Sequence, residues 1–191
     1  MVHVVNLPVG TITEIINIDD PRVMVPIDEV VEQLKNDKDK IVRSMYGIPD
    51  INEKIVKYKT EVSYIAKCTR EEIKETNKIR YFKVHVKYFP SEKEVDLIIP
   101  SYVKLFSRTA KSYVPVEFIR KSDILTDYTG NIVQVFENEQ VEDFQPTEYY
   151  SIKFTVGNNK YPITFYLEGI FANVCYNDFN IGTVEETESI I

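Results

Sequence analysis

The 191-residue sequence has no tryptophan, six glycines, two cysteines and two histidines. Two cysteines are too few for a disulfide framework or for a zinc site built from four thiolates. The scarcity of glycine disfavours a backbone cradle for phosphates, and the motifs GxxxxGKS/T, GxGxxG, HExxH, GxSxG and CxxC are all missing. No apolar stretch approaches the ~20 residues of a membrane-spanning helix, and the N-terminus does not resemble a signal peptide. We therefore expect an unsecreted protein with no catalytic residues, metal, cofactor or membrane contact.

β-branched residues are abundant: isoleucine, valine and threonine together supply 59 of the 191 residues, against 6 leucines and 3 alanines. These side chains are restricted at their first torsion and fit a pleated strand better than a helix. The chain is 43% hydrophobic and 28% charged with a net charge of -7, which is typical of a globular protein. We expect a single, mainly β domain over residues 1–191, because this length suffices for one buried core.

One helix is predicted over residues 27–46. Its apolar residues recur at spacings of three and four, and they are Ile27, Val30, Val31, Leu34, Ile41, Val42 and Met45. Pro26 suits the first turn and Gly47 suits the exit. The polar run 35–40 interrupts the apolar stripe, so a break at that point stays open.

A second, short helix is predicted at about 70–77, because Thr69 and Glu72 have the spacing of a capping box. The expected fold class is therefore α+β. It consists of a mainly antiparallel sheet or a small barrel with one long helix and one short helix.

Two long strands are predicted on either side of the short helix. Residues 79–89 alternate between an apolar face and a polar one, and residues 55–67 alternate similarly. If the two strands pair, their basic side chains form one surface, made of Lys57, Lys59, Lys67, Lys83, His85 and Lys87. Tyrosines are interleaved with these residues, which favours binding of single-stranded nucleic acid through phosphate contacts and base stacking. An accessory protein that binds nucleic acid is therefore one alternative, although the isoelectric point near 5.0 argues against it.

Shorter strands are predicted in the second half of the chain, at 95–100, 113–119 and 132–136. Residues 127–131, DYTGN, form a predicted turn before the last of these. The segments YYSIKFTV and KYPITFYL, joined by Gly157, Asn158 and Asn159, predict a hairpin.

The charges are segregated along the chain. Residues 51–125 carry 16 basic and 10 acidic groups, whereas residues 126–191 carry 2 and 11. This segregation suits either internal pairing or head-to-tail contact between copies, and the acidic arm at 137–148 and the acidic tail at 185–191 are the candidate interaction segments. The candidate interface residues are Glu137, Glu139, Glu142, Asp143, Glu185, Glu186 and Glu188.

A small enzyme with a dispersed site is the third alternative. Cys68 could serve as a nucleophile with His85 as its base if the two predicted strands pair. The simpler interpretation is that Cys68 is buried and His85 belongs to an exposed polar face. The carboxylate pairs of the chain lack the glycine and the ligand spacing of a calcium loop.

In its short length, its composition typical of AT-rich genes and its lack of targeting signals, the chain resembles a virion component of tailed phages, such as a ring, neck or head-to-tail connector protein. The resemblance covers the overall character of the chain and no motif. It implies a non-enzymatic structural subunit that assembles in the host cytoplasm into the virion, as a homo-oligomer in contact with neighbouring virion proteins.

Overall fold

The computed structural model describes residues 2–10, 14–16, 24–36, 42–49, 55–73, 79–155, 164–174 and 184–185. Two large antiparallel sheets dominate them. The first has the order β15 (Val184–Glu185), β1 (Val2–Pro8), β12 (Glu148–Thr155), β5 (Ile55–Thr69) and β4 (Val42–Pro49). The second has the order β13 (Thr164–Leu167), β14 (Ile170–Val174), β8 (Val103–Ser107), β10 (Ile124–Thr126), β11 (Ile132–Val141), β6 (Tyr81–Tyr88) and β7 (Glu94–Pro100), and β9 (Ser112–Pro115) pairs with β8.

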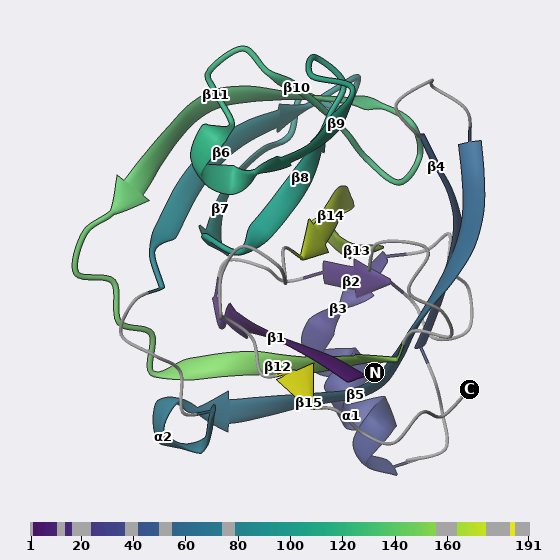
Figure 1. Cartoon of the computed structure of the whole chain (residues 1–191), viewed down its shortest axis with the longest axis vertical. Helices are drawn as coiled ribbons and strands as arrows, with labels where there is room; N and C mark the ends of the chain where they lie inside the picture. Colours follow the sequence, from purple (N-terminus) through teal and green to yellow (C-terminus); the bar gives the residue numbers. More distant parts are fainter. Residues whose placement is uncertain are drawn as a thin grey trace.

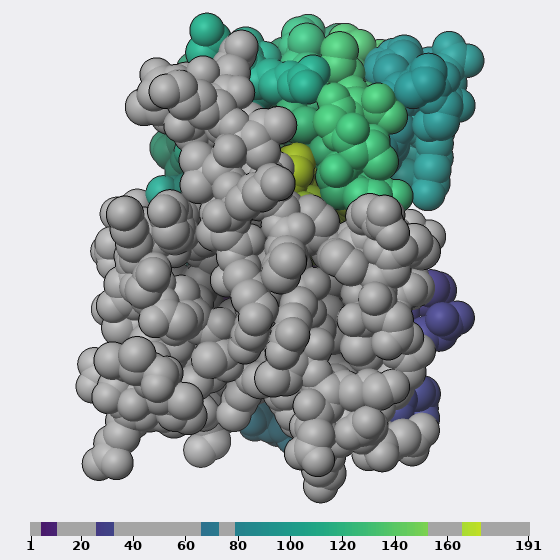
Figure 2. All heavy atoms as spheres, turned by 90° about the vertical axis from the view of Figure 1, so that its right-hand side faces the viewer, coloured from purple at the N-terminus to yellow at the C-terminus, as the bar shows by residue number. Residues whose placement is uncertain are grey.

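The eight-stranded sheet curls around the upper part of the molecule, whereas β1 and β12 cross the lower part (Figure 1). A side view shows the strands β6 to β11 gathered at one end and α1 (Ile27–Asn36) towards the other (Figure 2). The remaining elements are β2 (Glu14–Ile16), β3 (Met24–Pro26), α2 (Arg70–Ile73) and the 3-10 turn η1 (Val116–Phe118).

One hydrophobic core joins the two sheets. Val5 and Leu7 of β1 belong to it together with Val84 and Val86 of β6 and Leu97 of β7. All five are at most 1% exposed. Burial of such a side chain contributes about 1.5–3 kcal/mol, so this layer holds the sheets in a fixed relation.

The expected α+β class with a long helix is wrong, because the described structure is mostly β with two short α-helices. The apolar stripe forms α1 as far as Asn36, with Ile27, Val30 and Val31 buried. Residues 42–46, assigned to the same helix by their spacing, instead belong to β4, which pairs with β5 along its whole length. Hydrogen bonds of a sheet ladder therefore outweigh the local helical periodicity there.

The predicted strand pairings are also wrong. β5 pairs with β4 and β12, and β6 pairs with β7 and β11, so the two basic segments lie in different sheets. The predicted hairpin is absent for the same reason: β12 lies in the five-stranded sheet and β13 in the eight-stranded one. Alternation identifies a strand but carries little information about its partner.

Several local predictions are confirmed. Glu72 Oε1 accepts hydrogen bonds from the Thr69 backbone N–H (3.2 Å) and hydroxyl (2.9 Å), so the Glu72 side of the capping box forms. Gly130 has a φ of +86° in the predicted turn, and β11 follows it. β11 continues to Val141, so the first part of the predicted acidic arm is strand. None of the helices in the described part of the chain has the length and apolar character needed to cross a membrane.

Candidate functional site

The two large sheets meet at a polar contact between Asn6 of β1 and Tyr102 of the turn from β7 to β8. The backbone N–H of Asn6 donates to Tyr102 Oη (3.1 Å), and the Tyr102 hydroxyl donates to the Asn6 carbonyl oxygen (2.8 Å). Asn6 is 5% exposed and Tyr102 is fully buried. We call this contact the sheet junction.

Tyr102 occupies the place of a strand partner at the outer edge of β1. In an antiparallel strand the N–H and C=O of one residue point to the same neighbour, and successive residues alternate. Val9 N–H bonds to Glu148 O on the β12 side, so the backbone groups of Asn6 point away from β12. On that side, among the residues that the structure describes, β15 pairs with Val2 and His3 and no strand pairs with Asn6. A single phenolic hydroxyl therefore satisfies two buried backbone groups that would otherwise lack partners.

The side chain of Asn6 lies beside Ser151. The two residues face each other across β1 and β12, and Ser151 is 8% exposed. Because their backbone groups point away from each other, they form the closer type of antiparallel pair, with Cα atoms about 4.5 Å apart. Asn6 Oδ1 is buried and has no hydrogen-bond partner among the described residues. A buried amide oxygen without a partner is costly and calls for an explanation.

The chemistry available at the sheet junction is that of a polarised peptide. A hydroxyl that donates to a carbonyl oxygen stabilises negative charge on that oxygen when the carbonyl carbon is attacked. The side-chain amide of Asn6 is the group closest in covalent connection to the Asn6 carbonyl carbon. Burial strengthens the electrostatic interaction between the Tyr102 hydroxyl and the carbonyl oxygen. The sequence offers one signal for this site: an asparagine within the apolar run VVNLP of a strand buried on both faces. The partnership with Tyr102, 96 residues away, has no signal in the spacing.

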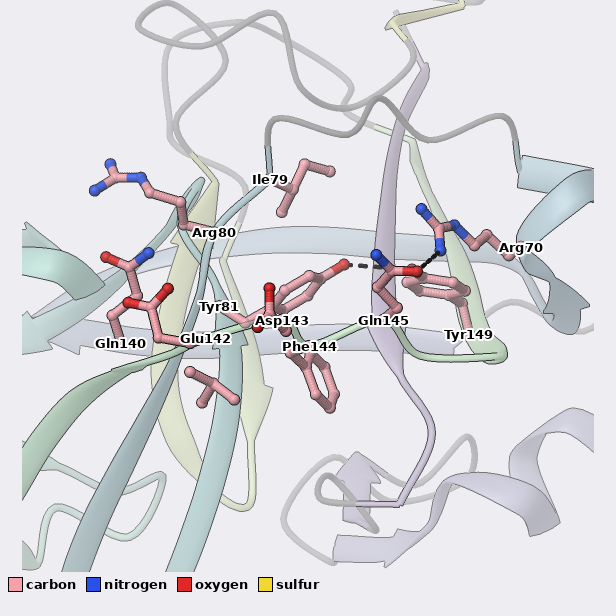
Figure 3. Close-up of a pocket in the computed structure, with 11 residues that line it drawn as sticks. Arg70, Ile79, Arg80, Tyr81, Gln140, Glu142, Asp143, Phe144, Gln145 and Tyr149 are labelled. Atoms are coloured by element: carbon pink, nitrogen blue, oxygen red, sulfur yellow. Dashed lines mark hydrogen bonds between the residues drawn. The ribbon is translucent and has the colours of Figure 1, made fainter.

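A pocket of about 580 Å³ opens close to the sheet junction (Figure 3). We call it the link pocket, because the chain links from β5 to β6 and from β11 to β12 supply most of its lining. The lining residues are Arg70, Ile79, Arg80, Tyr81, Gln140, Val141, Glu142, Asp143, Phe144, Gln145 and Tyr149. Ser101, next to Tyr102, donates its N–H to Arg80 O (2.8 Å), and Tyr149 pairs with Pro8 of β1. The link pocket and the sheet junction therefore lie on neighbouring elements of the fold.

The predicted basic surface does not form. Lys83, His85 and Lys87 lie on β6, whereas Lys57, Lys59 and Lys67 lie on β5 in the other sheet. Acidic residues of the neighbouring strands flank the β6 row in register, namely Glu94 and Asp96 of β7 and Glu137 and Glu139 of β11. Lys67 Nζ lies 3.5 Å from Asp28 of α1. The single basic surface that the nucleic-acid alternative required is therefore wrong, because its six residues belong to two different sheets. On β6 the row is also flanked by carboxylates.

His85 is held between two carboxylates. Its Nδ1 lies 2.6 Å from Asp96 Oδ1 and its Nε2 lies 3.1 Å from Glu94 Oε1. The hydrogen bond to Asp96, followed by that to Glu94, raises the pKa of the imidazole above its usual value, because both favour the charged form. This histidine is a surface ion-pair group.

Cys68 and His85 do not form a catalytic pair, since they lie in different sheets. Burial, followed by the negative charge of Glu72, raises the pKa of the Cys68 thiol, which disfavours the reactive thiolate. Cys175 lies outside the described residues. Within those residues, no group of three or more His, Cys, Asp or Glu side chains is arranged to hold a metal ion.

The acidic interface candidates are scattered. Glu137 and Glu139 lie on β11, Glu142 and Asp143 line the link pocket, and Glu185 ends β15. Glu186 and Glu188 lie outside the described residues. Their role as interface residues stays a prediction.

No protein-family model matches the chain, and neither does any curated protein. The chain is similar to solved structures, among them the solution structure of a bacterial intein-like domain from Clostridium thermocellum. That likeness has a TM-score of 0.52 at 14% identity and covers 88% of this chain and 97% of that one. Two further similar structures are the gp41-1 intein (TM-score 0.45, 13% identity, 88% and 98% covered) and the PabCDC21-1 intein (0.48, 15%, 87% and 98%).

The likeness to the Clostridium thermocellum domain identifies an intein-like fold and corrects the functional expectation. The resemblance to a phage ring, neck or connector protein is wrong, because the fold is of another kind. The expectation of a non-enzymatic structural subunit of a virion is overturned with it, because it depended on that resemblance and the fold is that of an intein-like domain. The resemblance to a phage protein rested on composition and length, which reflect the origin of the gene and not the chemistry of the protein.

Proposed function

We propose that the chain is a self-processing domain of the intein-like kind, which breaks a peptide bond of its own backbone at the sheet junction. The observation that carries the proposal is the double contact of Tyr102 Oη with the backbone of Asn6, within a fold similar to an intein-like domain. Self-processing requires a peptide carbonyl that is buried, fixed and polarised, and these are the properties of the Asn6 carbonyl.

The candidate bond is the one between Asn6 and Leu7. Attack of Asn6 Nδ2 on its own carbonyl carbon forms a succinimide ring, and the bond to the Leu7 nitrogen breaks. The proton lost by Nδ2 passes to the departing amine, so no other reactant is consumed. Tyr102 donates to the carbonyl oxygen as negative charge develops on it, and burial keeps water from competing for that oxygen.

Three features of the described structure support this assignment. The hydroxyl of Tyr102 is already within hydrogen-bond distance of the oxygen that would carry the charge, so this donor is in place before the reaction. The nucleophile and the carbonyl belong to one residue, which gives a high effective concentration. The Oδ1 atom of Asn6 has no hydrogen-bond partner among the described residues, so no bond to this oxygen holds the side-chain amide in place.

The test is the mass of the purified full chain, followed over time of incubation. We expect fragments 1–6 and 7–191 whose masses add up to that of the intact chain, with a later gain of one water as the succinimide hydrolyses. The variant N6A should not be cleaved, and Y102F should be cleaved about 100-fold more slowly, as for loss of an oxyanion donor. S151A is the matched control: it removes a buried polar group beside Asn6 and should still be cleaved.

Circular dichroism of each variant separates loss of reaction from loss of fold. Cleavage that persists in folded N6A, or a wild-type chain that keeps its mass, would refute the proposed function.

A further inference from the structure

A second pocket, of about 410 Å³, takes no part in the proposed reaction. We call it the turn pocket, because the turns from β6 to β7, from β10 to β11 and from β13 to β14 supply its lining. Tyr88 and Phe89 lie at the first turn, Asp127 and Tyr128 at the second, and Glu168 at the third. The volume of the turn pocket lies within the range of small-molecule sites.

Hydrogen bonds between the turns fix the walls of the turn pocket. The Tyr88 hydroxyl donates to the Glu168 carbonyl oxygen (2.6 Å), and the Tyr128 backbone N–H donates to the Gly169 carbonyl oxygen (2.7 Å). The ring of Tyr128 also packs edge-on against the ring of Tyr166, with their centroids 6.1 Å apart. The walls are therefore in place before a ligand binds, which lowers the entropic cost of binding.

Asp127 has a carboxylate where its turn requires only one acceptor atom. Its Oδ1 accepts three hydrogen bonds, from the Thr129 backbone N–H (2.9 Å), the Thr129 hydroxyl (2.6 Å) and the Asn131 backbone N–H (2.8 Å). Asp127 is 9% exposed, and in the described part of the chain it forms no ion pair and its Oδ2 accepts no hydrogen bond. An asparagine would make the same three bonds without the cost of a buried charge. The second oxygen therefore points to a cationic ligand.

The arrangement around Asp127 selects the kind of cation. Because three donors already occupy Oδ1, a guanidinium group cannot bind both oxygens of this carboxylate. A hard metal ion prefers about six or more oxygen ligands, whereas Tyr88, Phe89 and Tyr128 bring aromatic rings to this lining. A primary ammonium group is a compact charge that a single carboxylate oxygen can bind. An alkyl chain attached to it would contact the rings.

We propose that the turn pocket binds a small alkylammonium ion, with the ammonium group at Asp127 Oδ2 and the alkyl chain against the aromatic side chains. A charged hydrogen bond to Oδ2 offsets the cost of burying the carboxylate. Lys93 also lines the pocket, but it is exposed and forms no ion pair with Asp127 within the described residues. The proposal does not depend on the self-processing reaction, because the residues it uses are absent from the sheet junction.

The probe is n-butylammonium, titrated at low salt into the full-length N6A variant and followed by amide chemical shifts. N6A keeps the chain intact during the titration, and we expect saturable shifts at the residues of the turn pocket. 1-Butanol has the same chain without the charge and butyrate has the opposite charge, so each should bind about tenfold more weakly or worse. Ethylammonium lacks two CH₂ groups and should also bind about tenfold more weakly, because each buried CH₂ contributes about a factor of four.

The same head group occurs in free amines and in lysine side chains. N-acetyl-lysine amide distinguishes these sources, since it carries the ammonium group on a peptide-like body without terminal charges. Binding as tight as that of n-butylammonium identifies a lysine side chain as a ligand, and weaker binding identifies a free amine. Both results support recognition of an alkylammonium group.

Variants in the N6A background assign the position of the ammonium group. D127N removes the charge and keeps an Oδ1 acceptor for the turn, so it should weaken n-butylammonium about tenfold and leave 1-butanol unchanged. The matched control D123N changes a carboxylate of another turn, which accepts the Arg120 backbone N–H (2.8 Å) outside the pocket, and should change nothing. K93Q removes a positive charge from the lining and should tighten n-butylammonium about threefold.

Three results would overturn the proposal. They are equal binding of n-butylammonium and 1-butanol, no saturable shift at the turn pocket, and unchanged n-butylammonium binding in folded D127N. The first two need no variant of Asp127, so they decide the matter even if D127N does not fold.

Discussion

Replacement of Tyr102 by phenylalanine isolates the contribution of one hydroxyl at the sheet junction. The ring stays in its buried place, while the N–H and C=O of Asn6 both lose their partner. A buried backbone group left unsatisfied costs about 1–3 kcal/mol, so the loss of two partners in Y102F should lower the free energy of unfolding by roughly 2–6 kcal/mol. For a chain of this length the melting temperature falls by about 2–4 °C per kcal/mol, which gives a drop of roughly 4–24 °C.

Urea unfolding followed by circular dichroism measures this loss, with an unchanged m-value as evidence that the denatured state is the same. Amide exchange at Asn6 should also accelerate, since its N–H loses the only acceptor described for it. The matched control is Y88F, in which the lost hydroxyl donates to one carbonyl, Glu168 O at 2.6 Å, in a half-buried place. A loss in Y102F that is below about 1 kcal/mol, or no larger than in Y88F, would refute the assigned role of the Tyr102 hydroxyl.

Two other sites give sharp predictions. Asp96 and Glu94 raise the pKa of His85 in the folded chain, so the contribution of His85 to stability is complete below its unfolded pKa and is lost as pH rises through its folded pKa. The pKa of His85 measured by NMR titration should therefore exceed 6.5 in the native chain, and D96N should lower it. A pKa that is unchanged in D96N would contradict the pairing. Gly130 and Gly169 both have positive φ, but an added Cβ meets open space at the first and lies 3.1 Å from the ring of Tyr128 at the second. G169A should thus destabilise the chain by about 1 kcal/mol more than G130A in thermal melts, and equal losses would show that the ring moves aside at little cost.

Local features of the fold could be predicted from the sequence because their causes are local. The capping box of Thr69 and Glu72 depends on residues three apart, and the turn before β11 depends on Gly130. The alternation of β6 places Val84 and Val86 in the core because successive strand residues face opposite sides.

The pairing of the strands could not be predicted, because it depends on partners far apart in sequence. Residues 42–46 have helical spacing, yet together with residues 47–49 they form β4 through the ladder with β5. The alternation of β6 predicted a basic binding surface, but the sequence did not indicate that β7 and β11 place carboxylates beside this row.

The candidate site was beyond prediction for a related reason. Asn6 and Tyr102 are 96 residues apart, and neither belongs to a motif. An asparagine inside an apolar strand indicates that its polar groups need hydrogen-bond partners, but the sequence does not identify those partners. The meeting of β1 with the turn after β7 is a product of the whole fold.

The most direct test of the central claim is the amino-terminal sequence of the chain after prolonged incubation of the pure, native protein. The account predicts a new terminus that reads Leu7, Pro8, Val9, released by cleavage after Asn6. A chain that retains only its original terminus, or that acquires a new one elsewhere, would contradict the assignment of the sheet junction as the reacting site.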